Sequence, residues 1–308
     1  MAKMNGILMV DKPTGVTSHD VVYKLRKHIG QQEVGHAGTL DPLASGLLVL
    51  LLGEGTKLSR LILSQKKSYL VTVKLGLLTD SWDTDGKTLI EEAVNFSEDQ
   101  ITKALNEIIK MEEFPLPIFS AVKIKGKKLY EYARSEQEVE VPKRVMSFYD
   151  LKILNIKPDE VQFEVSCNKG GYIRSLAYVL GEALNSCGTV SYLRRSGSHP
   201  YKIENALTLE ESLKLSVEEL ANQRSFESVE DILIDYKALT VSGRDETLMK
   251  NGAIPNEILR RMVYDQKQVN KLQKDEYIRV IGADEGRLIS LLHLAPNTKP
   301  KVFRKFNK

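Results

Sequence analysis

The sequence is poor in cysteine, since its 308 residues include only Cys167 and Cys187, in neither a CxxC motif nor a Cys/His spacing. This excludes a disulfide framework and gives no indication of a zinc site. Long apolar runs are also lacking: residues 47–52 are flanked by Ser45 and Glu54, whereas a membrane span needs roughly 18 apolar residues. The apolar run at residues 7–10 is too short for a signal peptide. We therefore expect a cytoplasmic protein without a membrane-spanning segment.

Charge of one sign is not in excess, because 44 Lys and Arg residues against 41 Asp and Glu residues leave a net charge of +3. Such a small charge does not by itself indicate a nucleic-acid partner. The signs are segregated, however: residues 123–134 and 299–308 are basic, and residues 91–100 and 216–235 are acidic. Segregation lets a protein present a basic face to phosphate. The alternative, which composition alone favours, is a solvated lysine hairpin and tail.

Motifs for nucleotide and metal binding are missing as well. The glycines form neither a GxGxxG nor a GxxxxGK[ST] pattern, so a phosphate-cradling nucleotide site is not indicated. His36 has no metal-ligand spacing to another histidine. The aspartates of residues 79–86 lack the EF-hand spacing and its closing glutamate, and we interpret this segment as a turn. We expect neither a cofactor nor a metal.

Hydrophobic periodicity predicts an α+β protein. Strands are expected in residues 66–76, 144–156, 160–170 and 189–201, and helices in residues 18–30, 97–110 and 172–184. Ser18 is expected to cap the first helix, and Ser97 with Gln100 the second. Residues 205–235 are acidic and helical in pattern, and short strands follow from about residue 236. We expect a large mixed, mainly antiparallel sheet with packed helices in residues 1–232 and a small β-rich domain in residues 233–308.

A single charge, Asp41, stands directly before an apolar run in the stretch GHAGTLDPLASGLLVLLLGEGTK, residues 35–57. An Asp-Pro pair by itself predicts a turn. Gly35 and Gly38, however, would let a ligand approach the backbone closely. The apolar strand that follows would also hold the loop rigid, as a carboxylate nucleophile or base requires. The residues alone leave both roles open.

Two further residues have a structural and a functional interpretation. Arg174 lies near the start of the helix expected in residues 172–184, where the helix dipole disfavours a cation. It is either a surface arginine or the partner of an anion such as the Asp41 carboxylate, which a guanidinium binds with two hydrogen bonds. Tyr69 begins an alternating strand. It is either a core aromatic, as strand propensity favours, or a platform on which an unstacked base lies.

Several segments occur together in the order and approximate spacing of one family. They are KPTGVTSHDVV, GHAGTLDPLASGLLVLLLGEGTK, KSYLVTVKLGLLTDSWDTDG, FSAVKIKGKKLYEYAR, CNKGGYIRSLAYVLG and LRRSGSHPY. The chain therefore resembles the TruB family of tRNA pseudouridine synthases over roughly its first 200 residues. GHAGTLDPLASGLL is highly specific to this family and its archaeal and eukaryotic relatives. Residues 233–308 resemble the family's small, PUA-like, RNA-contacting domain only loosely.

The resemblance implies a pseudouridine synthase fold and roles for individual residues. Asp41 matches the catalytic aspartate, Tyr69 the tyrosine that stacks on the uracil and helps to remove its C5 proton, and Arg174 the arginine that pairs with the carboxylate. His36 matches the histidine that takes the place of the flipped base in the T-loop, and Lys12 is expected to support the site and to contact the RNA. Phosphate contacts are expected from Lys123, Lys125, Lys127, Arg194 and Arg195. The chain departs from the family pattern at Phe119, where a tyrosine is usual, and at Ser196 and Gly197.

The implied reaction is the conversion of uridine to pseudouridine at position 55 in the T-loop of tRNA, with Asp41 as nucleophile and the base flipped out of its stack. Whether the carboxylate attacks C1′ or acts through a glycal path stays open. The isomerisation needs no cofactor or metal, and we expect a monomer whose partner is the T-arm stem-loop. The alternatives are a non-catalytic tRNA-binding or tRNA-folding module and a phosphate-cradling nucleotide enzyme.

Overall fold

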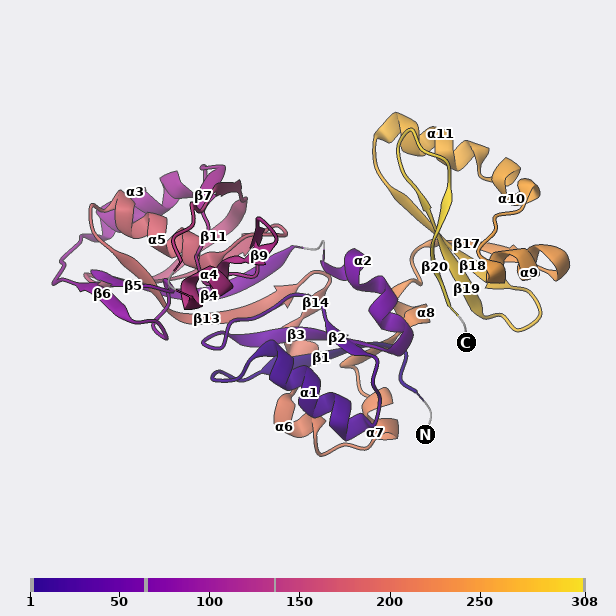
Figure 1. Ribbon diagram of the computed structural model, residues 1–308, viewed down its shortest axis with the longest axis horizontal. Coiled ribbons are helices and arrows are strands. Elements are labelled where there is room, and N and C mark those ends of the chain that lie inside the picture. The colour runs from indigo at the N-terminus through magenta and orange to yellow at the C-terminus, as the bar shows by residue number, and fades with distance from the viewer. Residues whose placement is uncertain (1–2, 64–65, 136, 307–308) are drawn as a thin grey trace. The chain divides into compact units, whose positions relative to one another are not determined.

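The structure is a computed structural model that describes residues 3–63, 66–135 and 137–306 (Figure 1). The other residues, including the last two of the basic tail, lie outside the described part. The chain divides into two compact units. The large unit comprises Leu8–Leu50 and Arg60–Ser225, and the small unit joins Phe226–Lys308 to Leu51–Ser59 and to the chain up to Ile7. The expected boundary after residue 232 lies close to Phe226, but the small unit also takes in two segments from early in the chain.

The strands are β1 (Gly6–Lys12), β2 (Val34–His36), β3 (Ser45–Leu52), β4 (Lys67–Leu75), β5 (Leu77–Thr79), β6 (Thr88–Glu91), β7 (Glu113–Pro115), β8 (Lys123–Ile124), β9 (Lys127–Lys128), β10 (Lys143–Val145), β11 (Phe148–Lys157), β12 (Glu160–Cys167), β13 (Gly188–Ser198), β14 (Tyr201–Lys202), β15 (Leu207–Thr208), β16 (Phe226–Ser228), β17 (Lys237–Val241), β18 (Glu276–Gly282), β19 (Leu288–Leu294) and β20 (Lys301–Lys305). The helices are α1 (Ser18–Ile29), α2 (Ser59–Leu63), α3 (Glu98–Ile108), α4 (Leu129–Arg134), α5 (Ile173–Ala183), α6 (Leu209–Ser212), α7 (Val217–Ala221), α8 (Val229–Ile232), α9 (Gly243–Asn251), α10 (Asn256–Arg261) and α11 (Val263–Leu272). Short 3₁₀ turns cover Gly53–Leu58 and Ile203–Asn205.

The large unit is built on a mixed sheet with the strand order β11–β12–β4–β13–β3–β1–β15 (Figure 1). The pairs β11–β12, β12–β4 and β4–β13 are antiparallel. In contrast, β13–β3 and β1–β15 are parallel. The predicted mixed, mainly antiparallel sheet is thereby confirmed.

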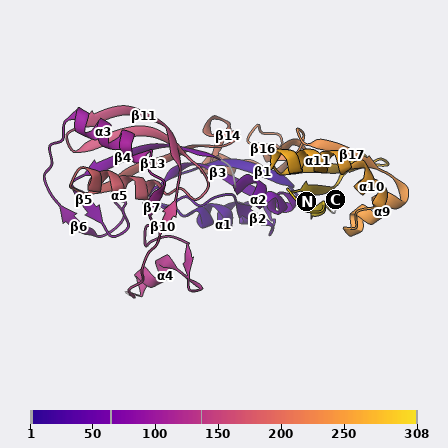
Figure 2. The same ribbon diagram turned by 90° about the horizontal axis from the view of Figure 1, so that it is seen from above.

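Burial along the strands follows the predicted alternation. In β4, Tyr69, Val71, Val73 and Leu75 are buried, and the whole of β3 is buried, as expected of a central strand in a covered sheet. Helix α5 packs on β13 and β4, and α3 packs on α5 and β11. Residues 119–145, called the arm below, carry β8, β9, α4 and β10 and project from this sheet (Figure 2).

The start of α1 differs from the prediction. Thr17, not Ser18, is the N-cap: its hydroxyl accepts from the backbone N–H of Asp20, whose carboxylate accepts from Thr17 in return. The Ser18 side chain points inward and binds the backbone of Leu40. The predicted capping box of Ser97 and Gln100 is confirmed.

The small unit contains a sheet with the order β17–β18–β19–β20, which confirms the strands expected after residue 236. Helices α9 and α11 pack on β19, and α10 packs on α11; the sequence patterns did not predict these helices. Their apolar faces complete a core with the sheet, formed by Val241, Met249, Ile258, Met262, Val269, Ile278, Val280, Ile289, Leu292 and Leu294.

Candidate active site

A cavity of about 410 Å³ opens in the large unit where the loop before β3 meets β4, β13 and the start of α5. We call residues 37–44 the Asp41 loop. The cavity is lined by this loop, by Tyr69, by residues 119–121 of the arm, by residues 168–174 and by Arg195. The three residues to which the sequence analysis gave catalytic roles, Asp41, Tyr69 and Arg174, all line it.

Asp41 and Arg174 form an ion pair in this cavity. The Arg174 Nη2 atom lies 2.9 Å from Asp41 Oδ2, with the arginine side chain 5% exposed and the aspartate side chain 36% exposed. The guanidinium also donates to the carbonyls of Ser81 and Phe119, at 2.9 and 3.0 Å. Because these bonds fix the guanidinium, the Asp41 carboxylate is held in one place while part of it stays open to the cavity. The anionic partner that the sequence indicated for Arg174 is therefore Asp41.

A second carboxylate, Asp83, stands on the other side of Arg174. Its Oδ2 atom lies 3.6 Å from Arg174 Nη1, and its Oδ1 atom accepts from the Ser81 hydroxyl at 2.6 Å. Burial raises the pKa of the Asp83 carboxyl, against the lowering effects of the Ser81 hydrogen bond and the Arg174 charge. From the sequence, residues 79–86 were interpreted only as a turn. The segment does form a turn, but the contact of Asp83 with Arg174 was not predicted.

The Asp41 loop is tied down by buried polar side chains. Ser18 donates to the Leu40 carbonyl and accepts from the Leu40 N–H. Lys12 is completely buried, and its Nζ donates to the carbonyls of Pro13 and Val16, at 2.9 and 2.7 Å, and to that of Pro42 at 3.5 Å. The supporting role expected for Lys12 matches this position, whereas its burial leaves no surface for an RNA contact.

Tyr69 lies beside the loop, with 7% of its surface exposed. Burial raises the pKa of its hydroxyl to about 12, although Arg195 opposes this shift through its charge and through a hydrogen bond to the hydroxyl. The side chain is therefore both a buried aromatic, as strand propensity favoured, and a wall of the cavity.

The two consecutive arginines of β13 occupy different surroundings. Arg194 is partly exposed and forms a bidentate ion pair with Asp11, with Nη–O distances of 3.0 and 2.6 Å. Arg195 is 1% exposed and donates to the carbonyls of Leu47, Gly38 and Thr39. The burial of Arg195 does not fit the phosphate contact expected from the sequence, because an RNA backbone cannot reach a side chain covered in this way.

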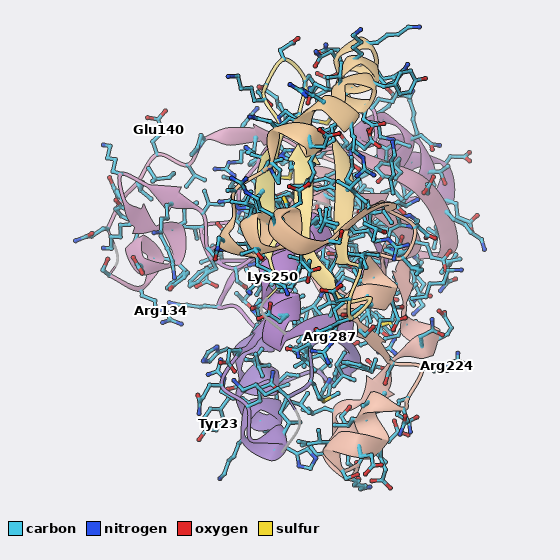
Figure 3. The ribbon with its side chains drawn as sticks, turned by 90° about the vertical axis from the view of Figure 1, so that its right-hand side faces the viewer. Tyr23, Arg134, Glu140, Arg224, Lys250 and Arg287 are labelled. Atoms are coloured by element: carbon cyan, nitrogen blue, oxygen red, sulfur yellow. The ribbon has the colours of Figure 1, made fainter. Side chains whose placement is uncertain are left out.

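His36 and the lysines of the arm are not part of the cavity lining among the described residues. His36 is half-buried with its Nδ1 atom unpartnered, and burial lowers the pKa of its imidazole. Lys123 and Lys125 are exposed. Lys127 donates to Ser135 and Gln137 and lies 4.6 Å from the centre of the Tyr132 ring. Figure 3 shows Glu140 and Arg134 at opposite edges of this arm.

Within the described ranges, no group of three or more His, Cys, Asp or Glu side chains is arranged to hold a metal ion. No helix of residues 3–63, 66–135 and 137–306 combines the length and the apolar character needed to cross a membrane.

Comparison with known proteins decides the family. The profile of the TruB family pseudouridylate synthase (N terminal domain) matches residues 26–173. A protein of Bdellovibrio bacteriovorus named tRNA pseudouridine synthase B is 41% identical over 299 residues, which cover 96% of this chain and 94% of that protein. The chain belongs to the TruB family. It is therefore a pseudouridine synthase, an enzyme that converts uridine to pseudouridine, and the resemblance stated from its motifs is confirmed.

Other TruB family members and solved structures agree. A protein of Alkaliphilus oremlandii, also named tRNA pseudouridine synthase B, is 38% identical and covers 85% of this chain and 87% of its own. A chain in the structure of an H/ACA RNP bound to a substrate RNA containing 2′-deoxyuridine has a TM-score of 0.64 at 19% identity and covers 98% of this chain and 85% of its own. A chain of a Cbf5-Nop10-Gar1 complex has a TM-score of 0.63 at 21% identity and covers 97% and 85%. These two likenesses confirm the pseudouridine synthase fold.

Within the TruB fold, sequence reasoning missed Asp83 and Tyr172 as parts of the site. Tyr172 precedes α5, lines the cavity, and has its hydroxyl pKa raised by burial. Both residues lie in segments that carried the family resemblance. Neither segment, however, contains a local signal for the tertiary contacts that bring these side chains to the cavity.

Proposed function

We propose that this TruB family member isomerises the uridine at position 55 in the T-loop of tRNA, with Asp41 as the nucleophile and with the target base flipped into the cavity. The curated relatives are named tRNA pseudouridine synthase B, which supports tRNA as the substrate class. In the reaction the C1′–N1 bond breaks, the uracil turns, and a C1′–C5 bond forms. C5 loses a proton and N1 gains one, so atoms and electrons balance without a redox step.

The observation that carries the proposal is the placement of the Asp41 carboxylate. A nucleophile needs to be fixed, ionised and accessible at once. The bond to Arg174 fixes the carboxylate and stabilises its charge, and 36% of the side chain remains exposed. Either open route, direct attack at C1′ or a glycal path, requires this carboxylate next to the ribose.

Base flipping is supported by the shape of the site. A uridine inside a folded loop can reach a recessed carboxylate only if it leaves its stack. The cavity volume of about 410 Å³ falls within the range of about 300–1,000 Å³ that is common for ligand pockets. Tyr69 offers an aromatic wall on which the flipped uracil would stack, and its oxygen would help to remove the C5 proton.

Recognition of the T-loop is proposed to depend on shape and phosphate contacts. The exposed Lys123 and Lys125 on the arm are suited to phosphate, and His36 is proposed to enter the T-loop. Residues 233–308 are proposed to add RNA contacts as a PUA-like domain. The enzyme is further proposed to act in the cytoplasm as a monomer.

The test uses an unmodified T-arm stem-loop and the variant Asp41→Asn, which keeps the size of the side chain but removes its charge. We expect the unchanged enzyme to form pseudouridine at the T-loop position, mapped by chemical modification and primer extension. The variant should still bind the RNA but form no pseudouridine.

Two results would contradict the proposal. Isomerisation at the normal rate by Asp41→Asn would remove Asp41 from the chemistry. Modification of a uridine outside the T-loop, with the T-loop uridine untouched, would leave a pseudouridine synthase with another specificity.

A further inference from the structure

Arg195 is a buried cation without a carboxylate partner among the described residues. Its side chain is among the largest that the structure buries completely, and no Asp or Glu oxygen of these residues lies within 4.0 Å of it, in contrast to Arg174 and Arg194. Burying an unpaired charge is costly. Such a group persists where its charge or its hydrogen bonds serve the site around it.

The hydrogen bonds of Arg195 lead to the Asp41 loop. Nε donates to the Leu47 carbonyl at 2.7 Å, Nη2 to the Gly38 carbonyl at 3.1 Å and Nη1 to the Thr39 carbonyl at 3.4 Å. These three carbonyls lie on both sides of Asp41 in the chain. The guanidinium therefore connects β13 to the start of the loop that carries the nucleophile and to β3, which follows that loop.

Strand pairing puts the same residue next to Tyr69. Arg195 is the register partner of Tyr69 across the antiparallel pair β13–β4 and of Gly46 across the parallel pair β13–β3. A Cβ atom at Gly46 would lie 2.3 Å from the Arg195 carbonyl oxygen, and one at Gly38 would lie 3.5 Å from Arg195 Nη1. The missing Cβ at Gly46 thus lets β3 lie close to this arginine, whereas the distance at Gly38 is that of an ordinary van der Waals contact.

The guanidinium has hydrogen-bonding capacity left for the cavity. It carries five N–H groups, and the carbonyls of Gly38, Thr39 and Leu47 take three of them. Arg195 lines the cavity together with Tyr69, its register partner, and its charge acts on the Tyr69 hydroxyl. One side chain therefore binds the loop of the proposed nucleophile and lies beside the proposed proton acceptor.

We propose that Arg195 is a positioning residue of the isomerisation, which fixes the Asp41 loop against Tyr69 and keeps a positive charge beside the Tyr69 hydroxyl while that oxygen takes the C5 proton. The inference rests on the function proposed above for Asp41 and Tyr69. It replaces the phosphate contact that the sequence suggested for Arg195.

The chemistry explains why a cation is needed there. Tyr69 can accept the C5 proton only after its own hydroxyl proton has left. That proton is balanced by the one that N1 of the displaced uracil takes up, and the C5 proton restores the neutral tyrosine. Burial, together with the charges of Cys167 and Asp41, opposes formation of the phenolate, and Arg195 is the neighbour that favours it. Without Arg195, the phenolate would lose the neighbouring charge that favours it.

The test compares Arg195→Gln and Arg195→Lys with Arg224→Gln as the control. Arg224 is exposed, bonds only to Glu204 and Asn205 among the described residues, and points outward in Figure 3. For Arg195→Gln we expect a single-turnover rate about 100-fold lower at saturating T-arm RNA, as displacement of a reacting group by 1 Å can cause, with little change in the Kd for RNA. Arg195→Lys restores the charge but not the fork of donors and should recover part of the rate.

A spectroscopic measurement separates positioning from mere support of the fold. With 3-fluorotyrosine placed at position 69, fluorine NMR follows the titration of that hydroxyl in the RNA-free enzyme. The pKa of the hydroxyl at position 69 should be higher in Arg195→Gln than in the wild-type enzyme. In Arg195→Lys it should return toward the wild-type value, and in Arg224→Gln it should stay unchanged. Circular dichroism shows whether each variant is folded. If Arg195→Gln does not fold, the rate and the titration of Arg195→Lys still test the proposal.

Three outcomes would overturn the inference. The first is an unchanged rate in Arg195→Gln. The second is a lower rate with an unchanged titration at position 69, which would make Arg195 a structural brace only. The third is weaker RNA binding with a normal rate at saturation, which would restore the phosphate contact. The titration needs no turnover, so it tests Arg195 even if the wild-type enzyme does not modify T-arm RNA and the proposed function fails.

Discussion

Replacement of Lys12 by methionine should change how the stability of the enzyme depends on pH. Lys12 is completely buried beneath the Asp41 loop. Burial lowers the pKa of its ammonium group from 10.5 to about 8, and the Asp41 charge opposes this shift only in part. The buried charge therefore destabilises the folded state at neutral pH, and the hydrogen bonds from Lys12 to backbone carbonyls offset part of this effect.

The sign of the effect follows from proton binding. Below about pH 8, Lys12 is protonated in both the folded and the unfolded chain, so the cost is constant. Between about pH 8 and pH 10.5 only the unfolded chain keeps the proton, and the free energy of unfolding therefore rises with pH. A shift of this size corresponds to about 3 kcal/mol, gained as the pH passes through that range.

Lys12→Met removes this contribution. It also leaves the carbonyls of Pro13, Val16 and Pro42 without their donor, at a cost of about 1–3 kcal/mol that does not change with pH. The difference in unfolding free energy between wild type and variant should therefore grow by about 3 kcal/mol from pH 8 to pH 10.5.

Urea unfolding followed by fluorescence at several pH values measures this difference. Lys152→Met, at an exposed position of β11, is the matched control and should leave the pH dependence unchanged. All other titrating groups cancel in the comparison because both proteins contain them. If the free energy of unfolding depended on pH in the same way in wild type and Lys12→Met, the reasoning would be refuted. Such a result would mean that Lys12 has the same proton affinity in the folded and the unfolded chain.

Three further predictions concern the site and its RNA contacts. Arg174→Lys should lower the single-turnover rate at least about 100-fold while RNA binding persists, because an ammonium cannot reproduce the fork that holds Asp41; a normal rate would exclude the ion pair from catalysis. Gly46→Ala should lower the free energy of unfolding by about 3 kcal/mol, because of both its φ of +103° and the clash with Arg195. Gly30 has a φ of +64° and open space around it, so Gly30→Ala should lower the free energy of unfolding by only about 1 kcal/mol. Equal losses of unfolding free energy in Gly46→Ala and Gly30→Ala would contradict the clash at Gly46. Lys125→Gln should reduce the slope of log K against log salt for RNA binding by about 1 with kcat unchanged; an unchanged slope would exclude a phosphate contact.

The sequence predicted the elements of the large unit well, because each carries a local pattern. The alternation in β4 and the capping box at Ser97 are both periodic or positional signals that need no tertiary contact. The pairing of Asp41 with Arg174 was also accessible, since a cation at the start of a helix is locally unfavourable and indicates a partner.

What the sequence did not predict depends on contacts between distant segments. Ser18 resembles a cap, but Thr17 takes that place because its partner Asp20 stands at the correct offset, and Ser18 is left to bind Leu40. The burial of Lys12 and Arg195 follows from packing against the Asp41 loop, and a charged side chain gives no local sign of such burial. The helices α9, α10 and α11 have weak or short apolar stripes and become helical against the sheet of the small unit.

The parallel pairing of β13 with β3 has a consequence for biosynthesis. Gly38 and Arg195 lie 157 residues apart in the chain, and contacts of such long range form late in folding because the intervening loop must first close. A growing chain on the ribosome therefore presents the Asp41 segment long before β13 is available to fix it. We expect a nascent chain that ends before β13 to have no isomerase activity, so that the enzyme becomes active only when nearly all of its large unit has been synthesised.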